Sequence, residues 1–206
     1  ARDGGVDLPS VFPESFIALD EMRAKASWKV SGPEVEMHLE RLDFRGPDAD
    51  GVARGVYRYR GDGPGEIDLT ASISRADGRA VWRYMPHAVG DDTRQWLKTS
   101  LIEGSAGDAR LTLRGNLRDF PFRQRDQGIF LITAKAKGVR IDYGKGWPMI
   151  EDLDADMRFG VGMRIESTRG RILGARFDKV VAELPDFVRV AAETGKLFSL
   201  ASQASE

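Results

Sequence analysis

Apolar and polar residues alternate along much of the chain, and this pattern predicts β-strands with one dry face and one wet face. The longest unbroken alternation runs over residues 67–74, and a period of two is the spacing of side chains on one face of a strand. Alternation continues beyond Gly138 at Val139, Ile141 and Tyr143. Similar stretches occur at 34–39, 111–113, 130–136, 152–159 and 163–166. We therefore expect a mainly β fold, an antiparallel meander whose outer face is charged.

One α-helix, over about residues 91–103, is expected to interrupt the strands. Either Asp91 or Asp92 is expected to cap its first turn, and Gly104 stands where a helix-ending glycine belongs. The apolar stripe at helical spacing consists of Trp96, Leu97, Leu101 and Ile102. This helix would be an insertion between two groups of strands.

Three further segments carry weaker signals. Residues 16–19 suggest a short helical turn ahead of a strand at 28–30. Residues 48–65 are rich in Gly, Asp and Arg, and we expect one strand there, flanked by long turns. A weaker C-terminal helix is predicted after Pro185.

Glycine is over-represented, with 23 residues in 206, about 11% against a usual share of about 7%. The glycines are expected to mark the joins between strands, among them Gly51, Gly104, Gly128, Gly138 and Gly170. No linker divides the chain, so we expect one β-rich segment over 1–206. A seam, if there is one, would lie near 86–104.

Composition narrows the function. The 31 Lys and Arg residues balance 32 Asp and Glu residues, so the chain lacks the basic surface of a nucleic-acid-binding protein. It has no cysteine, which excludes disulfides, thiol nucleophiles and cysteine metal sites. The longest apolar run is 129–132, far short of the ~20 residues that span a bilayer. The start at Ala1 has no signal-peptide pattern, so we expect a section excised from a longer protein.

Candidate catalytic groups are few. The acidic cluster 151–156 puts three aspartates on one strand face, which is typical of a face exposed to solvent. The functional alternatives are a cation site or a pair of catalytic carboxylates. Only His38 and His87 are present, without the spacing of a metal site or a catalytic triad. We therefore expect no enzyme activity, no metal and no cofactor.

Four tryptophans add a modest aromatic content. Trp96 is expected in the core and Trp147 in a packed turn before Pro148. Lectins place exposed tryptophans against sugar rings, so a carbohydrate-binding module stays an alternative at this point.

A succession of short blocks gives the chain a family resemblance. The blocks are 65–71 (GEIDLTA), 81–86 (VWRYMP), 93–97 (TRQWL), 114–122 (RGNLRDFPF), 142–148 (DYGKGWP), 174–177 (GARF) and 182–186 (AELPD). Their order and spacing resemble the central region of the YhdP branch of the AsmA-like proteins of Gram-negative bacteria.

The resemblance implies a long, repeated periplasmic rod with a hydrophobic groove, anchored in the inner membrane by a helix outside this chain. Such proteins are thought to let phospholipids move between the inner and outer membranes and so to maintain the permeability barrier. The partners implied are phospholipid acyl chains, together with other envelope proteins. The family has no catalytic residues to carry over.

The apolar faces of the strands are the expected lining of this groove. If the twisted sheet curls into an open trough, its apolar face offers acyl chains a dry path. The residues expected to line it are Ile67, Leu69, Ile73, Phe130, Ile132, Leu153, Met157, Phe159, Met163 and Ile165.

Two alternatives remain at this stage. The segment could be a structural or interaction module of the same envelope protein, with a closed core and no transported lipid. It could also be a carbohydrate-binding β-sandwich. A continuous uncovered apolar face would favour the groove, and a sealed core would favour the structural module.

Overall fold

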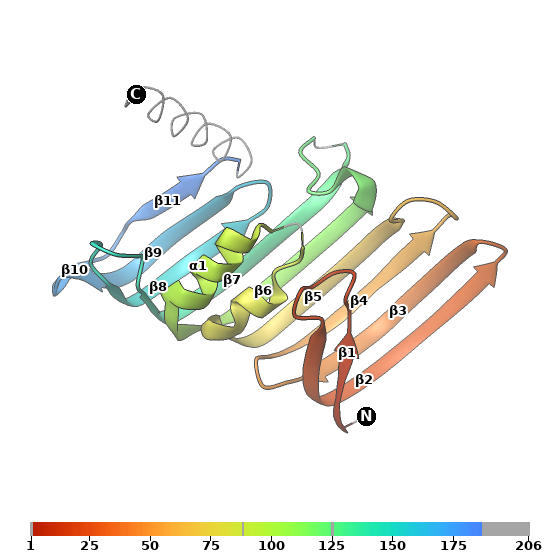
Figure 1. The fold of residues 1–206 in the computed structure, drawn as a ribbon, viewed down its shortest axis with the longest axis horizontal. Coiled ribbons are helices and arrows are strands. Elements are labelled where there is room, and N and C mark those ends of the chain that lie inside the picture. The colour runs from red at the N-terminus through yellow and green to blue at the C-terminus, as the bar shows by residue number, and fades with distance from the viewer. Residues whose placement is uncertain (1, 88, 125, 187–206) are drawn as a thin grey trace, which may run out of the picture.

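A computed structural model describes residues 2–87, 89–124 and 126–186 of the chain. These residues form one antiparallel sheet of 11 strands, in which β1 to β10 lie side by side in chain order and β11 pairs with β9 (Figure 1). This order confirms the predicted mainly β meander. The strands are β1 (Arg2–Asp7), β2 (Phe16–Ser31), β3 (Glu34–Arg45), β4 (Ala49–Tyr59), β5 (Glu66–Asp77), β6 (Leu101–Asn116), β7 (Gly128–Ile141), β8 (Ile150–Phe159), β9 (Met163–Ile172), β10 (Ala175–Phe177) and β11 (Val181–Leu184).

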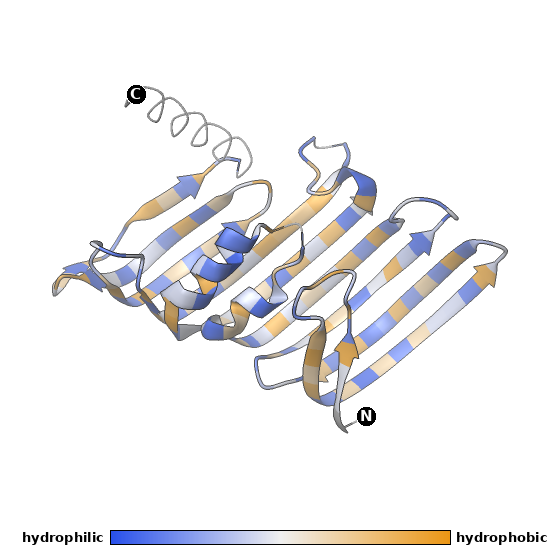
Figure 2. Cartoon of the chain, in the orientation of Figure 1, coloured by the Kyte–Doolittle hydropathy of each residue, from blue (hydrophilic) through white to orange (hydrophobic). Residues whose placement is uncertain are grey.

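The strands are longer than the sequence pattern predicts. β2 and β6 each contain 16 residues, and Figure 2 shows apolar and polar positions alternating along most of the sheet. The helical turn predicted over 16–19 is wrong, because these residues pair with β1, Ile17 opposite Val6. The predicted short strand at 111–113 is part of the C-terminal half of β6. The one strand predicted within 48–65 is β4, which occupies residues 49–59 and leaves less room for turns than expected.

Among the described residues, three helical segments interrupt the strands. They are the 3-10 helices η1 (Gly78–Tyr84) and η2 (Leu117–Asp119) and the α-helix α1 (Asp91–Ser100). The weaker helix predicted after Pro185 lies outside the described residues. β5 and β6, on either side of η1 and α1, pair directly with each other.

The insertion predicted over about 91–103 is confirmed as a helix that begins at Asp91, but the predicted capping residue and the predicted end are wrong. Gly90 is the N-cap, so neither Asp91 nor Asp92 caps the helix; both carboxylates lie in the first turn, where the helix dipole favours negative charge. The helix ends at Ser100, and the next residue, Leu101, pairs with Ile141 of β7. Strand pairing therefore overrides the local helical spacing.

Several glycines predicted at joins lie inside strands, namely Gly51, Gly104, Gly138 and Gly170, whereas Gly128 begins β7 and does mark a join. Gly115 and Gly128 face each other on β6 and β7 and make room for the ring of Phe122. A Cβ on Gly115 would lie 2.8 Å from Phe122 Cε1, and one on Gly128 would lie 3.0 Å from Phe122 Cγ. Phe122 is accordingly buried. Cross-strand glycines seat an aromatic ring here, which a side chain would prevent.

No second sheet packs on the first within the described residues. The buried apolar residues are only Ala80, Phe122, Ala134, Ala136 and Ala155, and no described side chain is completely enclosed. A β-sandwich, one of the alternatives from the sequence, is therefore wrong for this part of the chain. No helix among the described residues is long and apolar enough to cross a membrane.

Candidate functional site

A row of apolar side chains crosses the sheet from β2 to β11. Each member lies directly opposite the next in the strand register, and residues directly opposite each other project from the same face. With strands about 4.8 Å apart, the row extends about 38 Å. The members of this apolar row are Ala24, Leu42, Ala53, Ala71, Leu111, Ile132, Phe159, Met163 and Leu184.

Shorter rows extend the same surface along the strands. Leu39, Gly55, Leu69, Leu113 and Phe130 form a second continuous row. A third row passes through Trp28, Met37, Tyr57 and Ile67. We call the surface made by these rows and the apolar row the apolar face.

All ten residues predicted to line a groove lie on the apolar face, and all ten are half-buried. Ile132, Phe159 and Met163 belong to the apolar row, and the other seven lie on the same side of β5 and β7 to β9. The strand register shows this side directly. Three pairs lie opposite each other, namely Ile67 and Gly115, Ile73 and Ala109, and Val139 and Leu153. Two sets of three lie in line across neighbouring strands, namely Leu69, Leu113 and Phe130, and Ala134, Met157 and Ile165.

The sequence-based prediction missed the half of the apolar face formed by β2, β3 and β4. Ala24 and Ala53 are small, so they add little to a hydrophobic pattern. On β3 the period of two breaks between Leu39 and Leu42, where the ladder shifts register. A β-bulge adds one residue to a strand and restores its facing afterwards. The sequence signal for this bulge is that the apolar alternation before Leu39 and the alternation after Leu42 are offset from each other by one residue.

The apolar face is uncovered over much of its area. Trp28 is 73% exposed and Val30 is 63% exposed at the N-terminal edge. In the centre of the sheet, Leu111 and Ile132 are half-buried. The surface thus continues from strand to strand and is most open at its N-terminal edge, whereas Ala134, Ala136 and Ala155 on β7 and β8 are buried.

Two elements lie over one end of the apolar face. In Figure 1, α1 and η1 lie in front of the sheet, and both contact β6. η1 is held by Asp48, whose Oδ2 accepts hydrogen bonds from the Tyr84 hydroxyl at 3.1 Å and from Arg83 Nη1 at 3.2 Å. Burial, with the nearby Asp48 carboxylate, raises the pKa of Tyr84 to about 12. α1 is held by Trp96, whose indole Nε1 donates to the carbonyl oxygen of Tyr143 at 3.2 Å.

The opposite side of the sheet, the charged face, carries cross-strand ion pairs. Arg75 donates to both carboxylate oxygens of Asp50, at 3.0 Å from Nε and 2.9 Å from Nη2, and to the carbonyl oxygen of Gly46. The Arg75 guanidinium holds the pKa of Asp50 below its usual range. Arg41 lowers the pKa of Asp43 in the same way. Both carboxylates therefore become protonated at a lower pH than a free aspartate.

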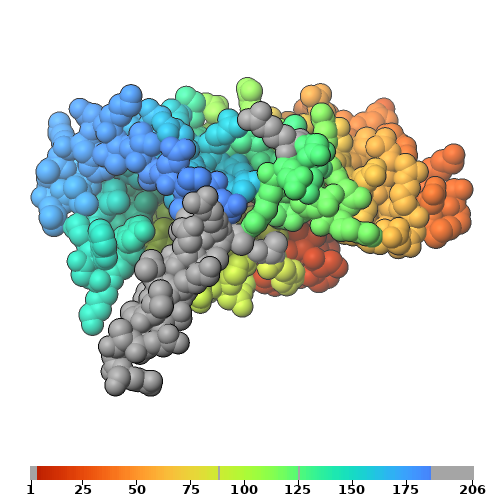
Figure 3. Space-filling view, turned by 90° about the horizontal axis from the view of Figure 1, so that it is seen from above, coloured from red at the N-terminus to blue at the C-terminus, as the bar shows by residue number. Residues whose placement is uncertain are grey.

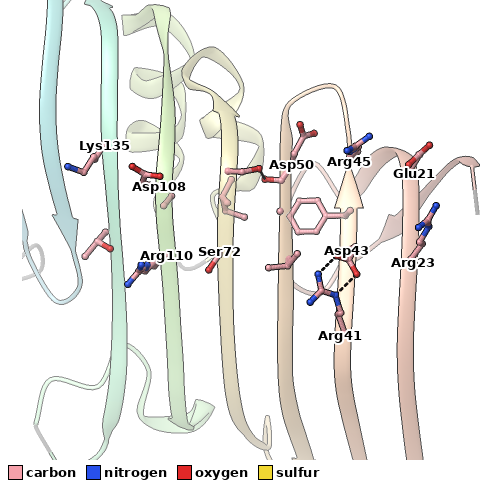
Figure 4. A pocket seen from close by; sticks show the side chains of 17 residues that line it. Glu21, Arg23, Arg41, Asp43, Arg45, Asp50, Ser72, Asp108, Arg110 and Lys135 are labelled. Carbon is pink, nitrogen blue, oxygen red and sulfur yellow. Dashed lines mark hydrogen bonds and ion pairs between the residues drawn. The ribbon is translucent and has the colours of Figure 1, made fainter.

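A shallow hollow of about 1170 Å³ lies on the charged face, across β2 to β7. Side chains of both signs surround small residues such as Ser72, so the hollow presents a mixed lining. In Figure 4 its labelled side chains point toward the viewer, whereas α1 and η1 lie behind the sheet. The helical segments therefore lie on the apolar side.

The acidic cluster 151–156 is ion-paired, which agrees with the predicted solvated face. Asp154 contacts Arg169 at 2.8 Å and Asp152 contacts Arg171 at 2.8 Å. Within the described ranges, no three potential ligands are grouped to hold a metal. His38 contacts Glu36, and His87 Nε2 lies 3.0 Å from the carbonyl oxygen of Pro9. Neither histidine is placed for a catalytic triad.

Comparison with known proteins assigns the chain to a family. The family model described as YhdP protein matches residues 1–194. The chain belongs to the YhdP family. A relative, the intermembrane phospholipid transporter YhdP of Escherichia coli (strain K12), is 25% identical over 169 residues. The match covers 80% of this chain and 13% of the relative, so the chain spans a small part of that protein's length. No solved structure matches the chain.

Proposed function

We propose that this chain forms one section of a hydrophobic groove along which phospholipids move between the inner and outer membranes. The acyl chains lie on the apolar face, and the headgroup stays in water. The protein acts in the periplasm of a Gram-negative bacterium, is anchored to the inner membrane by a helix outside this chain, and supports the outer-membrane permeability barrier. Transport rather than catalysis is the activity.

The observation that carries this proposal is the apolar row. At about 4.8 Å per strand the row extends about 38 Å, more than the ~15 Å of one acyl chain, which is half of a hydrocarbon core of about 30 Å. Its members are apolar on every strand that the row crosses. Each buried methylene is stabilised by about 0.8 kcal/mol. An acyl chain that advances by one strand exchanges one set of apolar contacts for another, so its binding free energy changes little along the row.

The absence of a closed core in the described part supports the groove over a structural module. A purely structural sheet gains stability by covering its apolar face. Here large apolar side chains, with Trp28 as the clearest example, stay exposed on that face. Exposed apolar surface of this extent is typical of an interaction site, and the transporter name of the relative indicates a lipid as the partner.

Photo-crosslinking in the full-length protein tests the proposal. A benzophenone amino acid is placed at Leu111, on the apolar face, or at its neighbour Thr112, on the charged face. The two positions are adjacent in sequence and both are half-buried, so they differ mainly in the face they occupy. We expect phospholipid adducts from position 111 and none from position 112. Absence of adducts at 111 would leave the structural module as the better account.

A further inference from the structure

Three aromatic side chains form a contiguous cluster beside the apolar face, which we call the aromatic wall. Trp96 belongs to α1, and Tyr143 and Trp147 belong to the segment between β7 and β8. The ring centroids of Trp96 and Tyr143 lie 5.6 Å apart, and those of Tyr143 and Trp147 also lie 5.6 Å apart. The sequence predicted Trp96 in the core and Trp147 in a packed turn, but both are exposed.

The aromatic wall is accessible and has polar tips. The exposed fraction is 37% for Trp96, 52% for Tyr143 and 68% for Trp147. Trp96 uses its indole N–H within the wall. Among the described residues, the Tyr143 hydroxyl and the Trp147 indole N–H have no protein partner. Because both side chains are exposed, these two hydrogen-bonding groups are accessible to a ligand.

The aromatic wall adjoins the apolar face. The segment 142–149 connects β7 to β8, and at its base Ile141 lies opposite Ile150 and Val139 lies opposite Leu153. In Figure 3 this segment, in teal, projects from the sheet on the same side as α1. A ligand on the apolar face of β7 and β8 therefore meets aromatic rings with polar tips at one end.

We propose that the aromatic wall holds the glycerol-ester region of a glycerophospholipid whose acyl chains lie on the apolar face of β7 to β9. This inference rests on the proposed function. Tryptophan and tyrosine collect where hydrocarbon meets polar headgroups, because one end of each ring system is apolar and the other forms hydrogen bonds. Tyr143 and Trp147 then donate to ester or phosphate oxygens. Lys145, exposed between them, supplies a positive charge for the phosphate.

The geometry favours a lipid over a saccharide. Sugar recognition by stacking requires an open, flat ring face. In the aromatic wall the planes of Trp96 and Tyr143 are inclined by 72°, and those of Tyr143 and Trp147 by 54°. The rings form a stepped edge rather than a platform, and this shape suits a flexible ester region.

Photo-crosslinking at Trp147 in the full-length protein tests the inference, with position 111 as the reference for acyl chains. We expect adducts at 147 whose fragments place the new bond on the glycerol or the first acyl carbons, and adducts at 111 on mid-chain carbons. Lipid adducts at 111 with none at 147 would overturn the inference about the aromatic wall and leave the proposed function intact. No lipid at either position would overturn both. Saccharide adducts at 147 would also overturn the inference.

A second measurement is the amount of phospholipid that co-purifies with the full-length protein. The double substitution Tyr143→Ala and Trp147→Ala is expected to lower it between about twofold and tenfold, from the loss of two ring contacts. Ile129→Ala is the matched control, because Ile129 is exposed but lies opposite Arg114 on the charged face. Equal retention by the double variant and the control would contradict the inference.

Discussion

Leu39 and Leu42 of β3 lie on the same face of the sheet although they stand three positions apart. Leu39 faces Gly55 and Leu42 faces Ala53 on β4, so β3 holds one residue more than its partner between them. The register against β2 shifts at the same place. Without this bulge, Leu42 would point to the charged face and the apolar row would be broken between β2 and β4.

The bulge predicts an unusual response to deletion. Removing Glu40 leaves Leu39 and Leu42 two positions apart, which a regular ladder places on one face, so the free energy of unfolding is expected to change by less than about 1 kcal/mol. Removing Asp43 instead turns Phe44 toward the charged face, with an expected loss of more than about 2 kcal/mol. Denaturant unfolding compares the two deletions. Equal losses would mean that the bulge does not set the facing of β3.

Ile132→Glu tests the apolar row at its centre. A carboxylate there meets acyl chains instead of water, which is costly for an unpaired charge, so lipid adducts from a crosslinker at Leu111 are expected to fall about tenfold. Thr133→Glu is the matched control, since Thr133 is the neighbouring residue on the charged face. Circular dichroism checks the fold of both variants. If Ile132→Glu unfolds the protein, Ile132 belongs to the structural core. If the variant folds and the lipid adducts persist, the apolar row is not the path of the lipid.

Asp48 is expected to hold η1 against the end of the sheet. Asp48→Ala removes the acceptor of the Tyr84 hydroxyl and the Arg83 guanidinium, and we expect a loss of about 1–2 kcal/mol in the free energy of unfolding. Asp48→Asn keeps an acceptor oxygen and should lose less. Because the Asp48 charge helps to raise the pKa of Tyr84 to about 12, alkaline absorbance titration should show a lower pKa for Tyr84 in both variants. An unchanged titration would mean that burial alone sets this pKa.

The ion pair between Asp50 and Arg75 predicts an acid-dependent part of stability. Arg75 lowers the pKa of Asp50 in the folded protein, so the pair stabilises the fold above the unfolded-state pKa of about 3.9. That contribution is lost as the pH falls below about 4 and through the lower folded-state pKa. Asp50→Asn should therefore show a shallower loss of thermal stability between neutral and acidic pH. Parallel pH profiles for the variant and the unsubstituted protein would contradict this assignment.

Much of the fold could be predicted from alternation alone, because a strand with one dry face carries its period in the sequence. The end of α1 could not be predicted in this way. Leu101 and Ile102 continue the helical spacing, and only the pairing of Leu101 with Ile141, 40 positions later, shows that they belong to β6. The place that Gly115 and Gly128 make for the ring of Phe122 could not be predicted either, because it depends on the pairing of β6 with β7.

The candidate site could be predicted only in part. Large residues such as Ile132 and Phe159 mark the apolar face clearly in β5 and β7 to β9. Ala24 and Ala53 complete the apolar row in the N-terminal half, but an alanine is equally common on either face of a strand. Whether the face is covered depends on the arrangement of all the strands, which local periodicity does not contain.

The central claim is that lipid follows the apolar row, and a crosslinking scan along that row in the full-length protein tests it most directly. The benzophenone residue replaces, one at a time, Ala24, Ala71, Leu111, Ile132 and Met163, with Ser72, Thr112 and Thr133 as charged-face positions. We predict phospholipid adducts at every position of the row and none at the charged-face positions. Adducts confined to one end of the row, or equal on both faces, would contradict the claim.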